Sequence, residues 1–230
     1  MGIVSTGIPR ELTLRLAAAV GSKAFVETGT YRGGTTRWAA EHFARVYTIE
    51  KASTLFDAFS PELARLPGVR TIFGDSRNVL PEVMKEIGDE PALIWLDGHW
   101  SGGDTSGLED ECPVLEELQC LAHRPSDIIL IDDARFFLAA PPRPHNPCQW
   151  PTIVDLVVAF DSFGEGRLLQ VIDDVIVLVP NVGNAREVVL DFAQRSAVSA
   201  QAANPIAGIV ERLRFWTRRR LSNVKESASF

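Results

Sequence analysis

The sequence predicts an α/β fold, a doubly wound and mostly parallel sheet of seven strands with the last strand antiparallel, followed by a C-terminal helical extension. Short runs rich in β-branched and aromatic residues alternate with stretches of helical periodicity, which is typical of strand–helix–strand units. Residues 93–96 and 128–131 are apolar throughout, as expected of strands covered by helices on both faces. The last two runs are joined by Asp173 and Asp174, a hairpin signal that makes one of them antiparallel.

The expected elements follow one another in a regular order. Strands are expected at residues 24–28, 46–50, 70–73, 92–97, 127–132, 168–173 and 175–179. Helices are expected at residues 9–21, 34–43, 53–66, 77–87, 111–122, 150–163, 185–203 and 206–220. Because right-handed crossovers join parallel strands, the first five strand–helix units form one sheet. We therefore expect a first domain over residues 1–183 and a helical extension over residues 184–230.

Two connections are unusually long. Residues 98–110 are polar and rich in glycine, and residues 136–150 include four prolines. Long loops in a compact domain commonly bind ligands or cover a site, so both loops are expected to be functional.

The composition is that of an ordinary globular protein, with 46% hydrophobic and 23% charged residues among 230. It excludes a disordered, collagen-like or coiled-coil chain. No run of 18 apolar residues could span a membrane, and the first 20 residues lack a secretion signal, so a cytoplasmic protein is expected. Three cysteines without C-x-x-C spacing indicate a reducing compartment and no structural zinc.

The net charge of −7 is unevenly distributed. Residues 205–230 contain six Lys or Arg and two Glu, so this end carries +4 and the rest of the chain −11. The strong negative charge of the chain before residue 205 argues against nucleic-acid binding. The basic stretch at residues 206–220 has an apolar face, which indicates a docking or homodimer helix; a helix that binds a membrane surface or an acidic ligand is the alternative.

A glycine-bearing turn after the first strand is the strongest functional signal. Glycine permits a tight bend, and backbone N–H groups at the start of the next helix favour an anionic group. The G-x-x-x-G-G spacing differs from the G-x-G-x-x-G of dinucleotide-binding proteins, and a plain strand–helix turn is the alternative. The candidate cofactor-binding residues here are Glu27, Thr28, Gly29, Thr30, Tyr31, Gly33, Gly34 and Thr35.

Acidic residues at the ends of the next two strands extend this pattern. Glu50 ends the second strand, where a carboxylate can accept hydrogen bonds from both hydroxyls of a ribose. Asp75 and Ser76 follow the third strand, where the carboxylate could either accept from an adenine amino group or cap the next helix. The sequence leaves both roles of Asp75 open.

These motifs, with Asp97 after the fourth strand, resemble those of the class I S-adenosylmethionine-dependent methyltransferases over about residues 20–180. The strand count and the final hairpin match that family as well. The resemblance implies that S-adenosyl-L-methionine is the cofactor. It implies that the glycine turn meets the amino-acid part of the cofactor, that Glu50 holds the ribose, and that Asp75 with Ser76 lies near the adenine.

A second group of acids is expected at the same edge of the sheet. Asp97 and His99 follow the fourth strand, and Asp132 and Asp133 follow the fifth, beside the switch in strand order where ligands bind. Three carboxylates favour Mg²⁺ or another hard divalent cation, which would lower the pKa of a bound hydroxyl. Helix capping or pairing with Arg135 is the alternative for these acids.

His99 is the expected base, because an imidazole has an unperturbed pKa of about 6.5 and can accept the proton of a hydroxyl nucleophile. His145, in the proline-rich loop, is the second candidate, and Asp97 completes the predicted catalytic set. A structural hydrogen bond is the alternative role of His99.

The acid cluster also resembles that of the metal-dependent sugar O-methyltransferases of antibiotic pathways. The resemblance places the metal on Asp97, Asp132 and Asp133, with His99 where that family has another acid. A looser resemblance to mannoside 1-O-methyltransferases points to a methylated mannoside. The predicted function is methyl transfer to a hydroxyl of a sugar or glycoside, on a small-molecule or oligosaccharide substrate.

Two other functions remain open from the sequence. One is a nicotinamide-dependent oxidoreductase or epimerase on the same kind of sheet, which would bind NAD(H) and not S-adenosylhomocysteine. The other is a non-catalytic cofactor-binding protein, whose role would survive replacement of Asp97 or His99.

Overall fold

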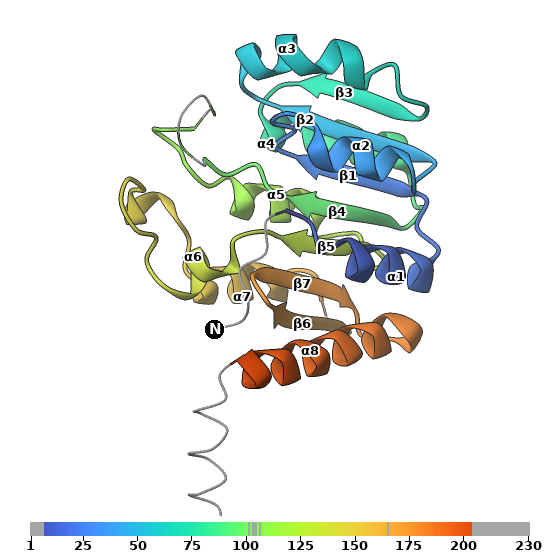
Figure 1. Ribbon diagram of the computed structural model, residues 1–230, viewed down its shortest axis with the longest axis vertical. Helices are drawn as coiled ribbons and strands as arrows, with labels where there is room; N and C mark the ends of the chain where they lie inside the picture. The colour runs from blue at the N-terminus through green and yellow to red at the C-terminus, as the bar shows by residue number, and fades with distance from the viewer. Residues whose placement is uncertain (1–6, 101, 103–104, 106, 165, 204–230) are drawn as a thin grey trace, which may run out of the picture.

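The computed structural model describes residues 7–100, 102, 105, 107–164 and 166–203. These residues form three layers, in which a seven-stranded sheet lies between two layers of helices (Figure 1). The helix predicted at residues 206–220 lies outside the described residues. None of the described helices is long and apolar enough to cross a membrane.

The sheet has the strand order β3-β2-β1-β4-β5-β7-β6. Its strands are β1 (Ala24–Thr28), β2 (Arg45–Glu50), β3 (Val69–Phe73), β4 (Ala92–Leu96), β5 (Ile128–Ile131), β6 (Arg167–Ile172) and β7 (Val175–Pro180). Strands β1 to β5 are parallel, and β7 pairs antiparallel with both β5 and β6. The predicted fold class is therefore confirmed, including the antiparallel last strand.

Helices cover both faces of the sheet. They are α1 (Arg10–Val20), α2 (Gly34–Ala40), α3 (Ser53–Leu63), α4 (Ser76–Ile87), α5 (Val114–Leu121), α6 (Ala134–Leu138), α7 (Ile153–Asp161) and α8 (Gly183–Ala203), with a 3₁₀ turn at Pro147–Gln149. Helices α1, α2 and α8 share one hydrophobic cluster with the sheet, and α4, α5 and α7 share the other. Helix α8 packs against α1, β6 and β7 (Figure 1). The domain boundary at residue 183 stays a prediction.

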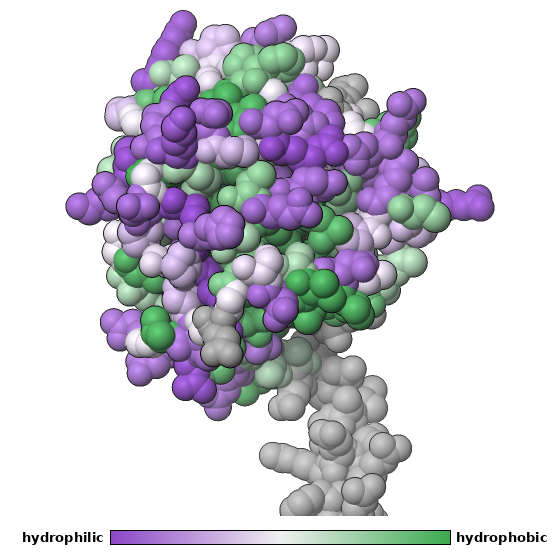
Figure 2. Space-filling view, turned by 180° about the vertical axis from the view of Figure 1, so that it is seen from behind, coloured by the Kyte–Doolittle hydropathy of each residue, from purple (hydrophilic) through white to green (hydrophobic). Residues whose placement is uncertain are grey.

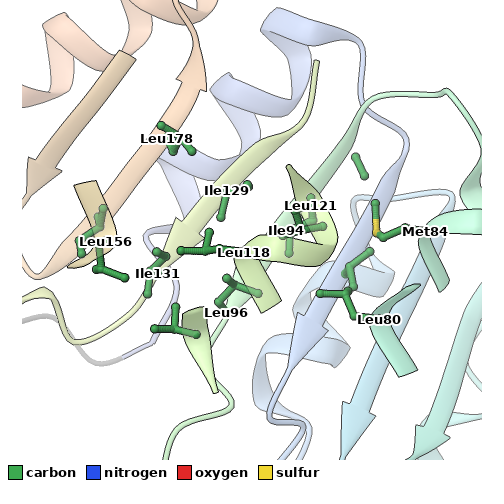
Figure 3. Close-up of a cluster of buried hydrophobic side chains, with 14 of the residues drawn as sticks. Leu80, Met84, Ile94, Leu96, Leu118, Leu121, Ile129, Ile131, Leu156 and Leu178 are labelled. Carbon is green, nitrogen blue, oxygen red and sulfur yellow. The ribbon is translucent and has the colours of Figure 1, made fainter. Parts of the chain in front are cut away.

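Alternate residues of the central strands pack on opposite sides, which explains why these strands are apolar throughout. Phe25 of β1 packs in the cluster of α1 and α2, whereas Val26 packs in the cluster of α4 and α5. Figure 3 shows the second cluster, in which leucines of α4 and α5, such as Leu80 and Leu118, lie with Ile94 of β4.

Helices α5 and α7 each begin three residues later than predicted, for local reasons. Pro113 holds the N-cap position of α5, so the helix begins at Val114. Thr152 caps α7 through a capping box with Asp155. Helix α6 was not predicted, because its five residues are too few to show a helical period.

Hydrophilic side chains cover much of the surface, with smaller hydrophobic areas between them (Figure 2). Three valines of α7, Val154, Val157 and Val158, are among the exposed apolar side chains. The homodimer contact through the C-terminal helices stays a prediction.

The strand order reverses between β1 and β4, and parallel sheets bind ligands beside the carboxyl ends of such a pair. Gly29, directly after β1, lies against the backbone of Asp97, directly after β4. Its φ of 84° is left-handed, and a Cβ at this position would overlap the carbonyl oxygen of Asp97. A glycine is therefore required where the two strand ends meet.

We expect Gly29→Ala to lower the free energy of unfolding by about 2–4 kcal/mol, because it combines left-handed strain with a backbone clash. The matched control is Gly34→Ala, because a Cβ at Gly34 has no atom within 4 Å. Urea unfolding of both variants checks this. Equal stabilities would contradict the close approach of the two strand ends.

Candidate active site

A pocket of ≈ 330 Å³ lies at the carboxyl ends of β1 to β4. Residues Gly102, Thr105, Gly107 and Asp110 of the glycine-rich loop line one part of it, so this loop borders the site as expected. Seven of the residues predicted from the sequence also line the pocket: Gly29, Tyr31, Glu50, Asp75, Ser76, Asp97 and His99.

Other predicted site residues do not line the pocket, namely Glu27, Thr28, Thr30, Gly33, Gly34, Thr35, Asp132, Asp133 and His145. Lys51, Gly74 and Gly98 line it and were not predicted. Each of these three directly adjoins a predicted residue, so closer attention to the strand ends would have found them.

Glu27 is buried beneath the glycine turn and supports it. The hydroxyls of Thr36 and Thr48 donate to its Oε2 at 2.6 and 2.8 Å, and the Thr30 hydroxyl lies 2.6 Å from that of Thr48. Burial raises the pKa of Glu27 to about 7, against the effect of these hydrogen bonds. Glu27 and Thr30 thus form a hydrogen-bonded layer behind the pocket.

Glu50 is held in place by two backbone amides. The N–H of Tyr31 donates to Oε2 and the N–H of Ala52 donates to Oε1, both at 2.8 Å. A carboxylate offers about four acceptor sites, so both oxygens can still accept a ligand hydroxyl. The geometry therefore suits the predicted ribose role of Glu50, since the carboxylate is oriented before any ligand binds.

Asp75 caps helix α4, and both of its carboxylate oxygens already have partners within the chain. It is the N-cap residue of α4 and accepts from the backbone N–H of Arg77 at 3.1 Å. The Arg77 guanidinium donates to both carboxylate oxygens, at 2.9 and 2.7 Å, and Lys51 Nζ lies 2.8 Å from Oδ2. These partners lower the pKa of Asp75. Of the two roles that the sequence left open, the structure shows the cap.

His99 and Asp133 form a close pair next to Asp97. The His99 Nε2 lies 2.8 Å from Asp133 Oδ2, while Nδ1 lies 3.9 Å from Asp97 Oδ1. Burial alone would lower the pKa of His99, but the hydrogen bond to Asp133 and the charge of Asp97 raise it. The pKa of Asp97 is raised well above its ordinary value, chiefly by burial, with Asp132 adding a like charge.

The three predicted metal ligands do not form a metal site in this arrangement. His99 occupies Oδ2 of Asp133, and Arg135 Nη1 lies 2.7 Å from Oδ1. Asp132 Oδ1 accepts from the backbone N–H of Asp133 at 2.8 Å. Across the described residues, no group of three or more His, Cys, Asp or Glu could hold a metal ion. The predicted Mg²⁺ site on Asp97, Asp132 and Asp133 is not supported, because an imidazole and a guanidinium take the place of a cation at Asp133.

His145 lies outside the pocket and ties the proline-rich loop to the start of α5. Its Nδ1 lies 2.9 Å from Glu111 Oε2, which also accepts from Trp150 Nε1 at 2.7 Å. The backbone N–H of Asn146 donates to Glu111 Oε1 at 2.8 Å. Burial would raise the pKa of Glu111, but these hydrogen bonds outweigh it and lower the pKa. His99 is therefore the histidine that the pocket presents.

Several solved structures with a similar fold are described as methyltransferases. The O-methyltransferase TomG of Streptomyces achromogenes, in complex with SAM, is 15% identical over 78% of this chain and 82% of its own, with a TM-score of 0.47. SMU.1697c of Streptococcus mutans, a putative methyltransferase in complex with SAH, is 10% identical over 76% and 98%, with a TM-score of 0.48.

A putative caffeoyl-CoA O-methyltransferase of Staphylococcus aureus is 16% identical over 77% of this chain and 86% of its own, with a TM-score of 0.48. No family model matches the sequence, and no curated protein matches it. Because these identities and TM-scores are low, the function proposed below rests on the residues of the pocket itself.

We expect Glu111→Gln to lower the free energy of unfolding at pH 7 by about 1–3 kcal/mol. The substitution removes the charge of a buried carboxylate and so weakens the hydrogen bonds that it accepts. The lowered pKa of Glu111 stabilises the fold above pH 4.5, its ordinary value, and this contribution is lost as the pH falls through the folded value. The variant should therefore lose less stability between pH 6 and 3 than the wild type.

Urea unfolding as a function of pH measures this difference. Glu109→Gln, an exposed neighbour, is the control and should behave as the wild type. Parallel pH curves for Glu111→Gln and the wild type would contradict the role of Glu111.

Proposed function

We propose that the chain is an S-adenosylmethionine-dependent O-methyltransferase that uses His99 as its base. The observation that carries the proposal is one pocket with two functional ends. Glu50, oriented by two backbone amides, lies on its wall, and Asp97 and His99 line it after β4, with Asp133 after β5 behind His99. A nucleoside cofactor and a hydroxyl nucleophile require these two groups.

The charge of the pocket suits this cofactor. S-adenosylmethionine carries a positive sulfonium and an ammonium group. Burial and mutual repulsion raise the pKa of Asp97, and burial raises that of Glu27, so a bound cation would stabilise their ionised forms. Two of the similar solved structures are described in complex with SAM or SAH. A nicotinamide dinucleotide would instead bring a pyrophosphate to this acidic region.

The proposed reaction transfers a methyl group in one step. The acceptor oxygen bonds to the methyl carbon as the carbon–sulfur bond breaks, and the electron pair stays on sulfur to give neutral S-adenosylhomocysteine. The proton of the acceptor hydroxyl passes to the His99 imidazole. Asp133 accepts a hydrogen bond from Nε2, orients the ring and stabilises its charged form.

No metal takes part in the proposed reaction, because the guanidinium of Arg135 lies 2.7 Å from Asp133 Oδ1 and would repel a cation at the predicted site. The proposed acceptor is a sugar or glycoside hydroxyl, as the sequence resemblance implies. Aromatic rings often pack against the apolar side of a sugar ring, and Trp100 and Trp150 lie in or beside the two long loops. They pack against His145 and do not line the pocket, so they do not contribute to the argument for a sugar. The acidic charge of the chain keeps nucleic acid an unfavourable substrate.

Calorimetric titration with S-adenosylhomocysteine and with NAD⁺ tests the cofactor. We expect only the former to bind, and Glu50→Ala to weaken it by about 5–150-fold, which corresponds to the 1–3 kcal/mol of charged hydrogen bonds. Glu41→Ala, an exposed carboxylate on α2's C-terminal side, is the control. Binding of NAD⁺ alone, or unchanged affinity in Glu50→Ala, would contradict the proposal.

His99→Gln should reduce kcat by roughly 10²–10⁴-fold, the usual contribution of a general base, with little change in S-adenosylhomocysteine affinity. Transfer of a tritiated methyl group from S-adenosylmethionine to methyl α-mannoside, methyl α-glucoside or catechol provides the assay. A near-normal rate in the variant would remove His99 from the mechanism. Label on catechol alone would contradict the sugar acceptor.

The pH dependence of the same assay tests the His99–Asp133 pair. Because the base must be neutral, kcat should rise with pH through a pKa above the ordinary 6.5 of histidine. Asp133 raises that pKa, so Asp133→Asn should move the rise to lower pH. An unmoved profile would show that Asp133 does not act on the base.

A further inference from the structure

The hairpin turn between β6 and β7 lies beside the end of β5, close to the His99–Asp133 pair. Because β7 runs antiparallel to β5 with Ile176 opposite Ile131, the residues before Ile176 lie next to those after Ile131. This register brings Asp174, the last residue of the turn, to the start of α6. Asp174 is 3% exposed and has no part in the reaction proposed above.

Asp174 hydrogen-bonds to the first two backbone N–H groups of α6. Its carbonyl oxygen accepts from the N–H of Ala134 at 2.8 Å, and its Oδ1 accepts from the N–H of Arg135 at 3.0 Å. The first N–H groups of a helix have no partner within the helix, so Asp174 supplies partners from another part of the fold. Asp133 is the N-cap residue, but its carboxylate is directed at His99 Nε2.

The backbone of Asp133 has an unusual conformation. Its φ of 56° lies in the left-handed region, which residues other than glycine seldom adopt. Such a conformation persists where the surrounding structure fixes it, and it is often found at functional sites. The two hydrogen bonds from Asp174 to the next two residues provide this support, so Asp174 holds the turn that carries Asp133.

A buried ion pair links Asp174 to the Asp133 carboxylate as well. Arg135 Nη1 and Asp174 Oδ2 are both buried and lie against each other. The same Nη1 lies 2.7 Å from Asp133 Oδ1, and Asp133 Oδ2 lies 2.8 Å from His99 Nε2. A chain of contacts therefore runs from Asp174 through Arg135 and Asp133 to His99.

Each contact of this chain fixes a group that could otherwise rotate. The carboxylate of an aspartate turns easily about its last bond, so its direction is set by what it contacts. Arg135 holds Oδ1 of Asp133 and thereby leaves Oδ2 facing His99. The Arg135 side chain is 32% exposed and stacks on Phe136, with the guanidinium carbon 4.3 Å from the ring centre. Its pairing with the buried Asp174 keeps it beside Asp133 rather than in solvent.

We propose that Asp174 is a positioning residue for the catalytic base. It fixes Asp133 in two ways, through the backbone at the start of α6 and through the guanidinium of Arg135. Asp133 can then hold the His99 ring in the orientation that receives the proton. The inference rests on the proposed function, and it gives the hairpin turn, which the sequence predicted only as a reversal of the chain, a part in the reaction.

Asp174→Asn breaks the ion pair but keeps the cap, because an asparagine oxygen can still accept from the backbone N–H of Arg135. We expect kcat for methyl transfer, measured on the high-pH plateau where His99 is neutral, to fall by about tenfold to a hundredfold, the cost of a misplaced group. The KM for S-adenosylmethionine and the affinity for S-adenosylhomocysteine should not change, because Asp174 does not line the pocket.

Asp173→Asn is the matched control, with the same change of charge in the same turn. Asp173 Oδ1 accepts from the Ser196 hydroxyl on α8, away from α6, so this variant should keep the wild-type kcat. A normal kcat in Asp174→Asn would overturn the inference. So would an equal loss of S-adenosylhomocysteine affinity, which would indicate a purely structural role.

Arg135→Gln shows whether Asp174 acts through Arg135. This variant should lower kcat by a similar factor, and the double variant with Asp174→Asn should be no slower than Arg135→Gln alone. Losses that multiply in the double variant would overturn the inference. If Asp174→Asn does not fold, Arg135→Gln by itself should lower kcat at unchanged S-adenosylhomocysteine affinity, and a normal kcat there would overturn it.

A measurement on the protein itself separates this inference from the proposed function. In NMR spectra of the full chain with ¹⁵N-labelled histidine, the Nε2 proton of His99 should exchange slowly with water. The exchange should be about tenfold faster in Asp174→Asn and unchanged in Asp173→Asn. An equal rate in Asp174→Asn and the wild type would overturn the inference. A wild type that protects this proton but transfers no methyl group would instead contradict the proposed function.

Discussion

The meeting of two strand ends, at Gly29 after β1 and Asp97 after β4, is the constraint on which the site depends. The backbone N–H of Asp97 reaches both the carbonyl and the hydroxyl of Thr28, each at 3.2 Å, and Gly29 packs against the Asp97 carbonyl. Because the strand order reverses here, the chain leaves the two ends in opposite directions and opens the pocket between them. Glu50, the proposed ribose ligand, and His99, the proposed catalytic base, are thereby held at the same edge of the sheet.

The site also depends on how its buried acids are compensated. Asp133 is compensated within the chain by the charge of Arg135 and by its hydrogen bond to His99. Asp97 has His99 Nδ1 only at 3.9 Å and Glu27 is held by hydroxyl groups, and burial raises the pKa of both acids. A cationic cofactor would supply the missing charge when it binds, which couples binding of the methyl donor to ionisation of the pocket.

The sequence predicted the parts that local pattern determines. The apolar runs located the strands, and the turn after β1 located the pocket through Gly29. It did not determine which side chains pair across the fold. Whether Asp75 would cap a helix or bind a ligand depended on Arg77 and Lys51 meeting it, and whether Asp133 would bind a metal depended on His99 reaching it. Which partner each acid meets depends on side-chain rotamers and on distances in the fold, and the spacing of residues in the sequence does not determine these.

A crystal structure of the chain grown with S-adenosylhomocysteine would show directly whether the pocket holds the cofactor. We expect a nucleoside in the pocket, with its ribose hydroxyls on the Glu50 carboxylate and its sulfur on the side of Asp97 and His99. A ligand bound elsewhere, or a ribose turned away from Glu50, would contradict it.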